Sequence, residues 1–350
     1  MFSNLRSLIF KLDPEKAHTL AIKSLKFNFV PNLFEEGEND GLFKTTLFNI
    51  DLKNPIGMAA GFDKNAEVYN QLFKLGFGFV EVGTITPLSQ YGNPKPRVFR
   101  LVEDEALINR LGFNNNGAQN ILDRIKKNPR TGILGINIGP NKDTQNRLED
   151  YLLGLKYFYK VADYITINIS SPNTENLRDF HDQTLLKELL IELKKEKKNL
   201  NSKIPIVVKI APDINDDEIE QISEVLISNE VEAVIISNTS DDTREKLIDI
   251  QKHQKGGLSG KPIEDKSNLL INKFYHHLKN KIKIIGVGGV DSGLSAYNKF
   301  LAGAHYIQLY TGMVYKGPNI VNMIKNDLCE LLLKDGVKNF TEIVGNKSKS

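Results

Sequence analysis

The chain has 350 residues, of which 40% are hydrophobic and 25% are charged, values typical of an ordinary globular protein. Its single cysteine, Cys329, excludes an intramolecular disulfide and any cysteine-cluster metal site. The formal net charge of +3 gives no indication of a nucleic-acid partner, and neither a signal peptide nor a membrane-spanning apolar run is evident. We therefore expect a protein of the cell interior that is soluble or peripheral to a membrane.

The first 40 residues predict a unit of two short amphipathic helices. Asp13 followed by Pro14 is a typical helix start, because proline is favoured at the first helical position. Basic side chains outnumber acidic ones in residues 1–26. An apolar face with a positive charge suits an anionic membrane surface, but the two helices could equally be elements that simply pack on the rest of the protein. The sequence leaves both interpretations open.

From about residue 54, short β-branched runs alternate with amphipathic helical segments, clearest at 185–193 and 216–227. The predicted strands are 56–60, 79–82, 132–138, 164–169, 205–210, 232–237, 282–286 and 305–309. This alternation indicates βαβ units and a parallel sheet. Because eight such runs are nearly all apolar, and therefore covered on both faces, they favour a closed (β/α)₈ TIM barrel over an open sheet.

Two insertions interrupt the alternation. Residues 45–52 predict a hairpin that plugs the bottom of the barrel, and the long segment 84–116 contains a strand pattern at 97–102. Loops of that length within a compact domain are usually functional. The predicted organisation is an N-terminal helical extension over 1–40, a barrel over 41–336, and a disordered polar tail over 337–350.

The ends of the predicted strands carry polar side chains of a common kind. In barrels, the loops that follow these ends hold the functional residues. Amides, amines and hydroxyls follow nearly every strand, whereas no grouping of His, Asp and Glu has the spacing of metal ligands, so no metal is expected. Because an asparagine amide both donates and accepts hydrogen bonds, this pattern predicts a cavity for a planar, amide-like ring.

Two further features indicate that this ring carries phosphate and accepts electrons. Lys209 ends an otherwise apolar strand, where an unpaired charge would cost several kcal/mol, so we expect it to contact a ring whose reduced form is anionic. Glycines at 286, 288 and 289 follow the seventh strand, and a second glycine-rich stretch spans 256–260. Such loops commonly bind phosphate through backbone N–H groups in barrels, although a glycine pair alone would also suit a plain turn.

Several sequence motifs resemble those of a known protein family. The motifs, which run in order between about residues 8 and 333, are Leu-Asp-Pro-Glu-Lys-Ala-His at 12–18, Ala-Gly-Phe-Asp-Lys at 60–64, Pro-Arg-Val-Phe-Arg-Leu at 96–101, Ile-Asn-Arg-Leu-Gly-Phe-Asn-Asn at 108–115, Asn-Ile-Ser-Ser-Pro-Asn-Thr at 168–174 and Val-Lys-Ile-Ala-Pro-Asp at 208–213. The chain resembles the dihydroorotate dehydrogenases of the quinone-dependent, membrane-associated class.

The resemblance implies a reaction and its partners. It implies oxidation of (S)-dihydroorotate to orotate in de novo pyrimidine (UMP) biosynthesis, with one non-covalent flavin mononucleotide (FMN) per chain as acceptor. A membrane quinone is the implied second substrate. The implied location is peripheral, on an anionic lipid surface at the cytoplasmic face of the cell membrane. No nucleic acid and no obligate protein partner are expected.

The resemblance also implies a role for particular residues. Ser171 is the implied catalytic base, where soluble members of the family use cysteine, with Thr174 as a proton relay and Phe113 as a shield. The implied substrate contacts are Lys64, Asn109, Arg110, Leu111, Gly112, Phe113, Asn168, Asn173, Asn238 and Thr239. The implied FMN contacts are Ala60, Gly61, Phe62, Asp63, Lys64, Thr84, Asn137, Asn168, Lys209, Ser237, Gly260, Gly288, Gly289, Tyr310 and Thr311. The implied lining of a quinone tunnel is His18, Arg100 and Tyr310.

Two other functions remain open from the residues themselves. One is another FMN barrel oxidoreductase, similar to a dihydrouridine synthase, which would need a basic nucleic-acid face or an extra helical domain. The near-neutral charge and the amphipathic N-terminus argue against it. The other is a non-catalytic barrel that only binds phosphate, which a flavin absorption spectrum would exclude.

Overall fold

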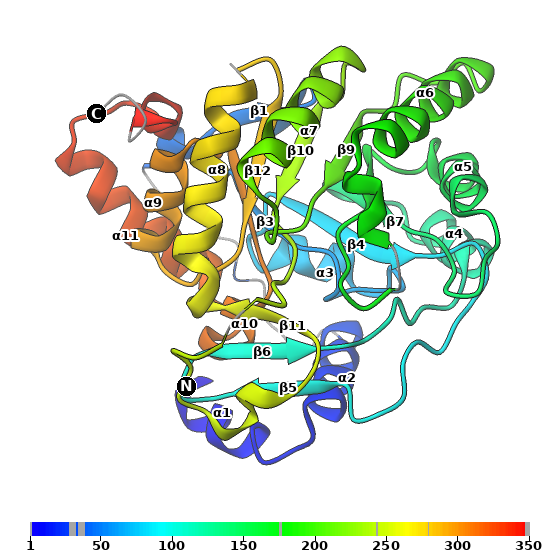
Figure 1. Ribbon diagram of the computed structural model, residues 1–350. Helices are drawn as coiled ribbons and strands as arrows, with labels where there is room; N and C mark the ends of the chain where they lie inside the picture. Colours follow the sequence, from blue (N-terminus) through cyan, green and yellow to red (C-terminus); the bar gives the residue numbers. More distant parts are fainter. Residues whose placement is uncertain are drawn as a thin grey trace.

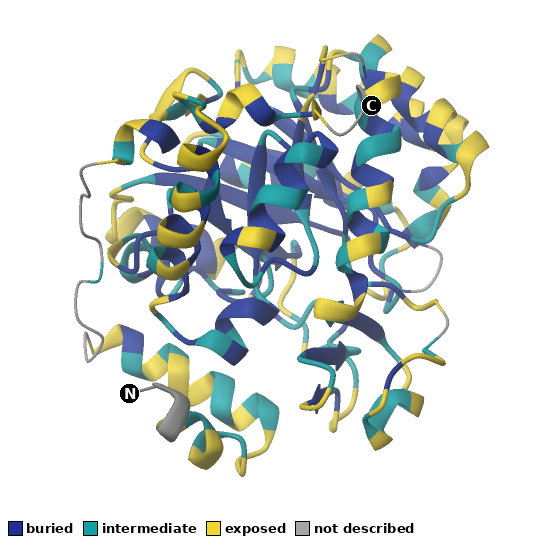
Figure 2. Cartoon of the chain, turned by 90° about the vertical axis from the view of Figure 1, so that its left-hand side faces the viewer, coloured by how far each residue is buried: buried dark blue, intermediate teal, exposed yellow. Residues whose placement is uncertain are grey.

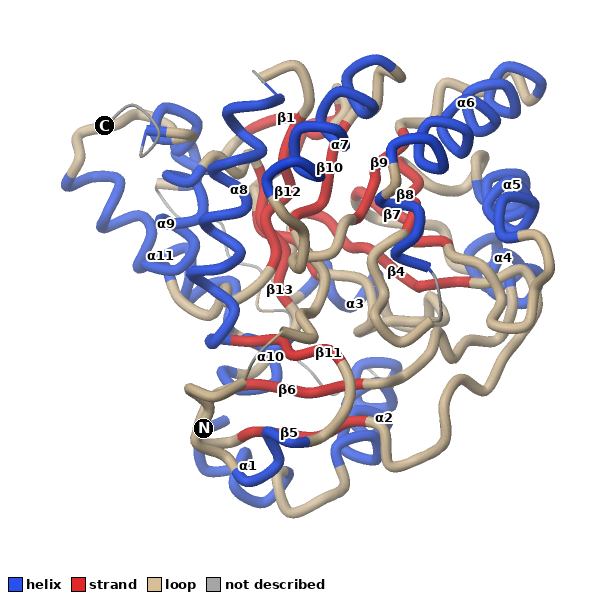
Figure 3. Tube along the Cα trace, viewed as in Figure 1, coloured by secondary structure: helices blue, strands red, loops and turns tan. Residues whose placement is uncertain are grey.

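The computed structural model describes residues 2–27, 33, 39–174, 177–242, 244–278 and 280–346. Its centre is a closed barrel of parallel strands (Figures 1 and 3). In chain order the barrel strands are β3 (Ile56–Met58), β4 (Phe79–Ile85), β7 (Ile133–Ile138), β8 (Tyr164–Asn168), β9 (Ile206–Lys209), β10 (Ala233–Ile236), β12 (Lys283–Val287) and β13 (Tyr306–Leu309). Each strand pairs with the next, and β13 closes the barrel by pairing with β3. The predicted TIM barrel and its eight strands are confirmed.

Helices surround the barrel and cover the outer face of its strands. They are α3 (Tyr69–Lys74), α4 (Ala118–Lys127), α5 (Arg147–Phe158), α6 (Gln183–Asn199), α7 (Asp216–Ser228), α8 (Glu264–Leu278), α9 (Gly293–Ala302) and α11 (Ile320–Lys334). Helix α7 illustrates why they form: Asn215 and Glu218 make a reciprocal capping box, and Ile219, Ile222 and Leu226 form its buried face. Because the strands are covered on both sides, they are buried almost throughout (Figure 2).

The barrel interior changes character along its axis. At the N-terminal ends of the strands, the hairpin of β1 (Thr45–Leu47) and β2 (Ile50–Leu52) inserts Leu47 and Leu52 into an apolar cluster with Phe79 and Tyr164. The predicted plug is therefore confirmed. Above this cluster the interior becomes polar, with Glu81 fully buried. Since the lower half is filled, any ligand site must lie at the opposite end of the barrel.

A second sheet crosses the C-terminal mouth of the barrel. It consists of β5 (Val98–Leu101), β6 (Ala106–Asn109) and β11 (Gly257–Gly260), all antiparallel, and it confirms the predicted strand within the long insertion. Figure 1 shows it below the barrel, beside the short helix α10 (Thr311–Lys316). Short 3₁₀ turns lie in the connecting loops: η1 (Asp40–Phe43), η2 (Leu177–His181), η3 (Ile250–His253) and η4 (Lys261–Ile263).

The two predicted N-terminal helices, α1 (Phe2–Ile9) and α2 (Pro14–Lys26), pack beneath this second sheet (Figure 1). The Asp13 side chain caps α2 by accepting a hydrogen bond from the Lys16 amide, as the Asp-Pro pair predicts. Apolar side chains on both helices remain exposed, with 62% of Leu8 and 50% of Leu20 accessible. No helix within the described ranges is both long and apolar enough to cross a membrane.

The prediction of a disordered tail from residue 337 is wrong for its first part. Residues Phe340–Ile343 form the 3₁₀ turn η5, and Phe340 is fully buried against Phe300 of α9, with ring centroids 4.9 Å apart. The polar composition of the tail concealed the apolar pair Phe340 and Ile343, which lie three residues apart and face the barrel together. The predicted disorder of 347–350 lies outside the described residues.

The plug makes a prediction for stability. Leu47→Ala removes a fully buried side chain from the apolar cluster, so we expect the free energy of unfolding to fall by about 2–5 kcal/mol. Denaturant unfolding of the two proteins measures this difference. Leu333→Ala, at a position 53% exposed on α11, is the matched control and should change stability by less than about 1 kcal/mol. Equal effects at the two positions would show that the hairpin does not support the barrel.

Candidate active site

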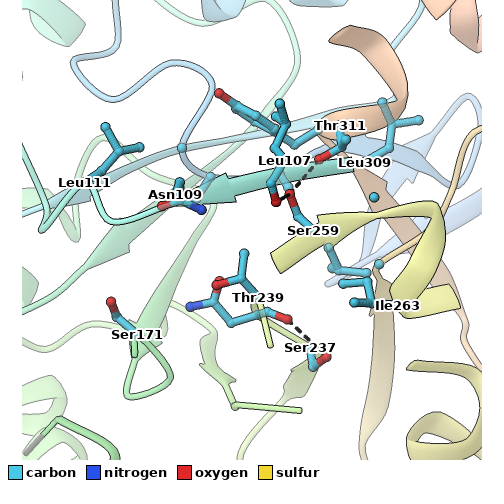
Figure 4. Close-up of a pocket in the computed structure, with 18 of the residues that line it drawn as sticks. Leu107, Asn109, Leu111, Ser171, Ser237, Thr239, Ser259, Ile263, Leu309 and Thr311 are labelled. Carbon is cyan, nitrogen blue, oxygen red and sulfur yellow. Dashed lines mark hydrogen bonds between the residues drawn. The ribbon is translucent and has the colours of Figure 1, made fainter. Parts of the chain in front are cut away.

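A cavity lies between the barrel mouth and the second sheet. In Figure 4, side chains of the second sheet, including Asn109 and Ser259, surround the same space as Ser171, Ser237 and Thr239 from the strand ends. The predicted site residues that line this cavity are Ala60, Gly61, Lys64, Thr84, Asn109, Leu111, Gly112, Phe113, Asn168, Ser171, Asn173, Lys209, Ser237, Asn238, Thr239, Gly260, Gly288, Gly289, Tyr310 and Thr311. The structure thus brings most of the predicted site together in one place.

The floor of the cavity is a chain of hydrogen-bonded polar side chains. Thr84 donates to the Asn137 Oδ1 atom at 2.7 Å, and Asn168 donates to the Thr84 hydroxyl at 2.9 Å. The Asn168 Oδ1 atom accepts from the Ser170 hydroxyl at 2.7 Å. Asn137 itself lies beneath the cavity and is fully buried, so it orients Thr84 instead of lining the space. The floor is rigid because each member is held by the next.

Lys209 is a buried amine without a hydrogen-bond or ion-pair partner among the described residues. Its side chain is only 5% exposed and lines the cavity. Within the described part of the chain, no group hydrogen-bonds to it or forms an ion pair with it. Burial lowers the pKa of Lys209, while the charge of Glu81 acts in the opposite direction. A buried charge without a partner is costly, so nothing within the described protein offsets the cost of burying this amine.

Two glycines with left-handed backbone geometry line one side of the cavity. Gly288 and Gly289 have φ values of 113° and 78°, in the region that favours glycine. A Cβ atom at position 289 would lie 2.4 Å from the Cβ of Glu264, so no other residue fits there without displacement. On the facing side, the hydroxyls of Ser259 and Thr311 are 2.8 Å apart. Ser259 was not predicted, although it lies within the glycine-rich stretch that was singled out.

The loop that carries Ser171 is held from several directions. The Ser171 Oγ atom accepts a hydrogen bond from the Asn173 amide at 3.2 Å, and Asn173 donates to the Asn109 carbonyl at 3.2 Å. Among the described residues, no His, Asp or Glu side chain hydrogen-bonds to Ser171. Thr174 is buried but does not line the cavity, and no described contact joins it to Ser171. Phe113 lines the cavity, as expected of a shield.

Two residues that the sequence did not single out clamp this loop. Arg178 donates to the Ser170 carbonyl at 3.3 Å and to the Asp241 carboxylate at 2.8 Å. His181 accepts from the Ala211 amide at 3.2 Å, and burial lowers its pKa to about 4, so the ring is neutral near pH 7. Both lie on η2, a short turn without a strong periodic pattern. Their contacts are made across neighbouring strand ends, which only the closed barrel brings together.

Lys64 lies where the cavity meets a second, apolar groove. Its ammonium donates to the Gly61 carbonyl at 2.7 Å. Burial lowers the pKa of Lys64 to about 8, partly offset by the charge of Glu15. Glu15 on α2 in turn pairs with Arg97 at 2.7 Å, an interaction that the sequence did not reveal. The amine therefore changes its charge close to the physiological pH range.

The groove is roofed by α1 and α2, and Lys64, Leu107, Leu111 and Tyr310 line both the groove and the cavity, so the two spaces are adjacent. All three residues predicted for a quinone tunnel, His18, Arg100 and Tyr310, line the groove. The His18 ring stacks edge-on against Phe62 at 5.2 Å. Burial lowers the pKa of His18 to about 3, which leaves an uncharged ring in an apolar passage.

Arg100 both lines the groove and fastens its roof. Its guanidinium donates to the carbonyls of Phe10 and Leu12 at 2.8 and 2.9 Å, in the turn between α1 and α2. It also lies over the Phe10 ring, 4.7 Å from the centroid. The groove therefore keeps its shape because a strand of the second sheet holds the helices by their connecting turn.

Besides Asn137, three predicted FMN or substrate contacts lie outside the cavity. Phe62 and Asp63 line the groove, and the Asp63 carboxylate is occupied by the amides of Glu67 and Val68, both at 2.7 Å. Asp63 therefore shapes its own loop, and neither residue reaches the space where FMN was expected. The Arg110 guanidinium donates to the carbonyls of Pro96 and Lys255 at the rim. It braces the second sheet and does not reach the cavity.

Comparison with known proteins identifies the family. The family model described as dihydroorotate dehydrogenase matches residues 42–332. A protein of Bartonella tribocorum named dihydroorotate dehydrogenase (quinone) is 46% identical over 343 residues, covering 96% of this chain and 94% of that protein. A protein of the same name from Aliivibrio fischeri strain MJ11 is 46% identical over 332 residues, covering 92% of this chain and 98% of that protein.

A solved structure agrees with this result. The ligand-free dihydroorotate dehydrogenase of Eimeria tenella superposes with a TM-score of 0.92 at 35% sequence identity, covering 97% of this chain and 100% of that chain. The match includes nearly the whole chain, and so extends beyond the barrel to the N-terminal helices. The resemblance drawn from the motifs is confirmed: the chain belongs to the dihydroorotate dehydrogenase family.

Proposed function

We propose that this protein oxidises (S)-dihydroorotate to orotate in pyrimidine biosynthesis, with FMN as the immediate acceptor and a membrane quinone as the second substrate. The observation that carries the proposal is the adjacency of two spaces. A polar cavity with Ser171 and Lys209 lies directly beside an apolar groove beneath the N-terminal helices, and the two share lining side chains. A polar substrate and a hydrophobic oxidant can thus reach the same cofactor from different sides. Relatives named dihydroorotate dehydrogenase (quinone) support this assignment.

The cavity fits one non-covalent FMN. Gly288, Gly289 and Thr311 line the cavity, and the backbone N–H groups of the two glycines would bind the phosphate. Lys209, which has no hydrogen-bond or ion-pair partner in the described parts of the chain, would contact the ring and favour its anionic reduced form. When bound, FMN supplies the acceptor for the hydride that leaves C6 of dihydroorotate. Thr84 and Asn168 form the polar floor on which the ring would rest.

The substrate site is proposed beside Ser171. The amides of Asn109, Asn173 and Asn238 line this part of the cavity and match the carbonyl and N–H groups of a pyrimidine ring. Ser171 would remove the proton at C5 as the hydride leaves C6. The Ser171 Oγ atom accepts a hydrogen bond from the backbone N–H of Asn173. This hydrogen bond orients the hydroxyl and would stabilise negative charge that develops on the oxygen. Thr174, buried nearby in the same loop, would relay the proton to an ordered water and so to solvent.

The groove is proposed as the route for quinone. His18, Arg100 and Tyr310 line it, and the exposed apolar residues of α1 and α2 surround its outer part. Those residues, together with the basic side chains of the helices, would rest on an anionic lipid surface. We accordingly place the protein at the cytoplasmic face of the cell membrane as a peripheral protein.

Ser171→Ala tests the proposed base. A general base contributes about 10²–10⁴-fold to the rate, so we expect anaerobic reduction of bound FMN by dihydroorotate to slow by that factor. Stopped-flow absorbance measures the rate, and the flavin spectrum shows whether FMN is still bound. Ser228→Ala is the matched control, because Ser228 is an exposed serine at the end of α7 and does not line the cavity. Near-normal reduction in Ser171→Ala would remove Ser171 from the catalytic role.

Lys64 predicts a dependence of substrate affinity on pH. Because the pKa of Lys64 is lowered to about 8 by burial, the amine loses its proton as the pH rises through that value. We expect the Lys64 cation to contact the substrate carboxylate, so binding above about pH 8 requires proton uptake and affinity should fall by up to about tenfold per pH unit. Orotate binding, followed through the flavin spectrum, measures this. Lys64→Met should bind weakly at every pH, and an equally steep profile in that variant would contradict the assignment.

Removal of residues 1–40 tests the groove. We expect reduction of FMN by dihydroorotate to persist and reoxidation by a hydrophobic quinone to slow sharply, because the roof of the groove is lost. Binding to anionic vesicles should also weaken. The truncation leaves Arg97 without Glu15, which can cost about 3–5 kcal/mol for a buried charge, so near-ultraviolet circular dichroism must first show a folded protein. Full rates in both half-reactions would show that the helices serve only for packing.

A further inference from the structure

A carboxylate lies inside the barrel, below the cavity, where the proposed reaction gives it no role. Glu81 on β4 is fully buried and does not line the cavity. Four side chains from three other strands donate to it: Asn137 at 2.8 Å, Thr166 at 3.0 Å, and Tyr164 and Gln308 both at 3.2 Å. Two of these donors are amide N–H groups, which cannot accept a hydrogen bond in return. The arrangement therefore suits an ionised carboxylate, whose oxygens only accept.

The negative charge at Glu81 determines which way the hydrogen bonds of the cavity floor run. Because a carboxylate only accepts, Asn137 must turn its NH₂ group towards Glu81 and its Oδ1 atom towards Thr84. The Thr84 hydroxyl must then donate to Asn137, and so it accepts from Asn168. The Asn168 Oδ1 atom is occupied by the Ser170 amide and hydroxyl. Asn168 is left with one free N–H for a ligand in the cavity.

Glu81 is also the acidic group whose charge acts on Lys209. The two side chains point into the same barrel interior from β4 and β9, and the Glu81 charge opposes the effect of burial on the Lys209 pKa. Lys209 nevertheless forms no ion pair with Glu81 within the described residues. The cation thus stays available to a ligand while a negative charge lies behind it. The low polarity of the surrounding barrel makes such charges effective over longer distances than in water.

We propose that Glu81 is a positioning residue that makes the cavity floor present a hydrogen-bond donor at Asn168 and that lowers the reduction potential of bound FMN by opposing Lys209. This inference rests on the proposed FMN site. A positive charge next to the ring stabilises the reduced anion, and a negative charge beneath it destabilises that anion. Glu81 and Lys209 together therefore hold the potential between the values that either charge alone would impose.

The test is Glu81→Gln, which removes the charge and keeps the size. The buried Gln308 Oε1 atom has no hydrogen-bond partner, so Gln308 can turn its amide to receive the new N–H group. We expect the affinity ratio of reduced to oxidised FMN to rise on the order of tenfold, which for two electrons is a potential less negative by about 30 mV. FMN affinity of the apoprotein should fall, because the direction of the Asn168 hydrogen bond is no longer fixed. Dye-coupled redox titration and flavin fluorescence measure the two quantities.

Two further variants separate charge from packing. Thr166→Val removes one donor to Glu81 and leaves the charge, so the potential should remain close to that of the unaltered protein even if stability falls. The double variant Glu81→Gln with Gln308→Glu moves the carboxylate to β13 in the same part of the barrel, and should return the potential towards the original value. This double variant preserves the composition of the barrel interior, and so it gives an answer even if the single variant does not fold.

The outcomes are distinct. An unchanged potential in folded Glu81→Gln, or the same shift in Thr166→Val, would overturn the inference. So would a double variant whose potential remains shifted as far as that of the single variant. Absence of bound FMN in the unaltered protein would instead overturn the proposed function, before Glu81 is tested at all.

Discussion

Closure of the barrel is the constraint on which the rest of the structure depends. Side chains on alternate positions of parallel strands must point into a common interior, and that interior has to be filled. Here the hairpin at the N-terminal ends and the apolar layer above it, including Phe79 and Tyr164, fill the lower half. The polar side chains at the opposite strand ends cannot be buried in the same way. They line a cavity instead. The free-energy cost of burying these polar groups is offset by hydrogen bonds to one another or to a ligand.

The buried charges show this division most clearly. Glu81 is satisfied entirely by side chains of the barrel, whereas Lys209, on the same inner surface, has no partner among the described groups. A protein gains no stability from an unpaired buried amine, so the stability of the fold does not explain the position of Lys209. The carboxylate is different, because side chains of the barrel itself satisfy it.

The second sheet converts the barrel mouth into a place where two different molecules can meet. Its strand β6 covers the cavity with Asn109. Arg100 of β5, and Arg97 directly before that strand, hold the N-terminal helices. The helices form the roof of an apolar groove, whose inner end reaches Lys64 and Tyr310. Because burial lowers the pKa of His18 to about 3, its imidazole ring is uncharged near pH 7 and the apolar groove carries no positive charge at this position. The polar and apolar routes are thus separated by side chains of a single layer.

The loop with Ser171 depends on contacts of another kind. Its backbone is held at the Ser170 carbonyl by Arg178, and Arg178 is itself fixed by Asp241 after the next strand but one. His181 makes a comparable link to Ala211 after β9. A serine without an acidic or imidazole partner relies on such placement, because the orientation of its hydroxyl is its main contribution.

The sequence by itself determined the barrel, the plug and most of the cavity lining, because these features follow from local patterns. Apolar runs of strand length define the barrel, and residues just after them must lie at one end of it. Tertiary structure alone decided which of those residues face the cavity. Asp63 turns to its own loop, Arg110 braces the rim, and Asn137 lies one step below the floor.

Glu81, Arg97 and Arg178 carried no signal in the sequence, since a charged residue within a strand or loop reveals nothing about its partners. Their partners are Asn137, Glu15 and Asp241, each more than 50 residues away along the chain. The buried Phe340 was missed for the same reason, because its contact with Phe300 exists only after α9 and the tail have packed together. Periodicity records which face of an element is buried, but contacts between distant segments are fixed only when the barrel closes.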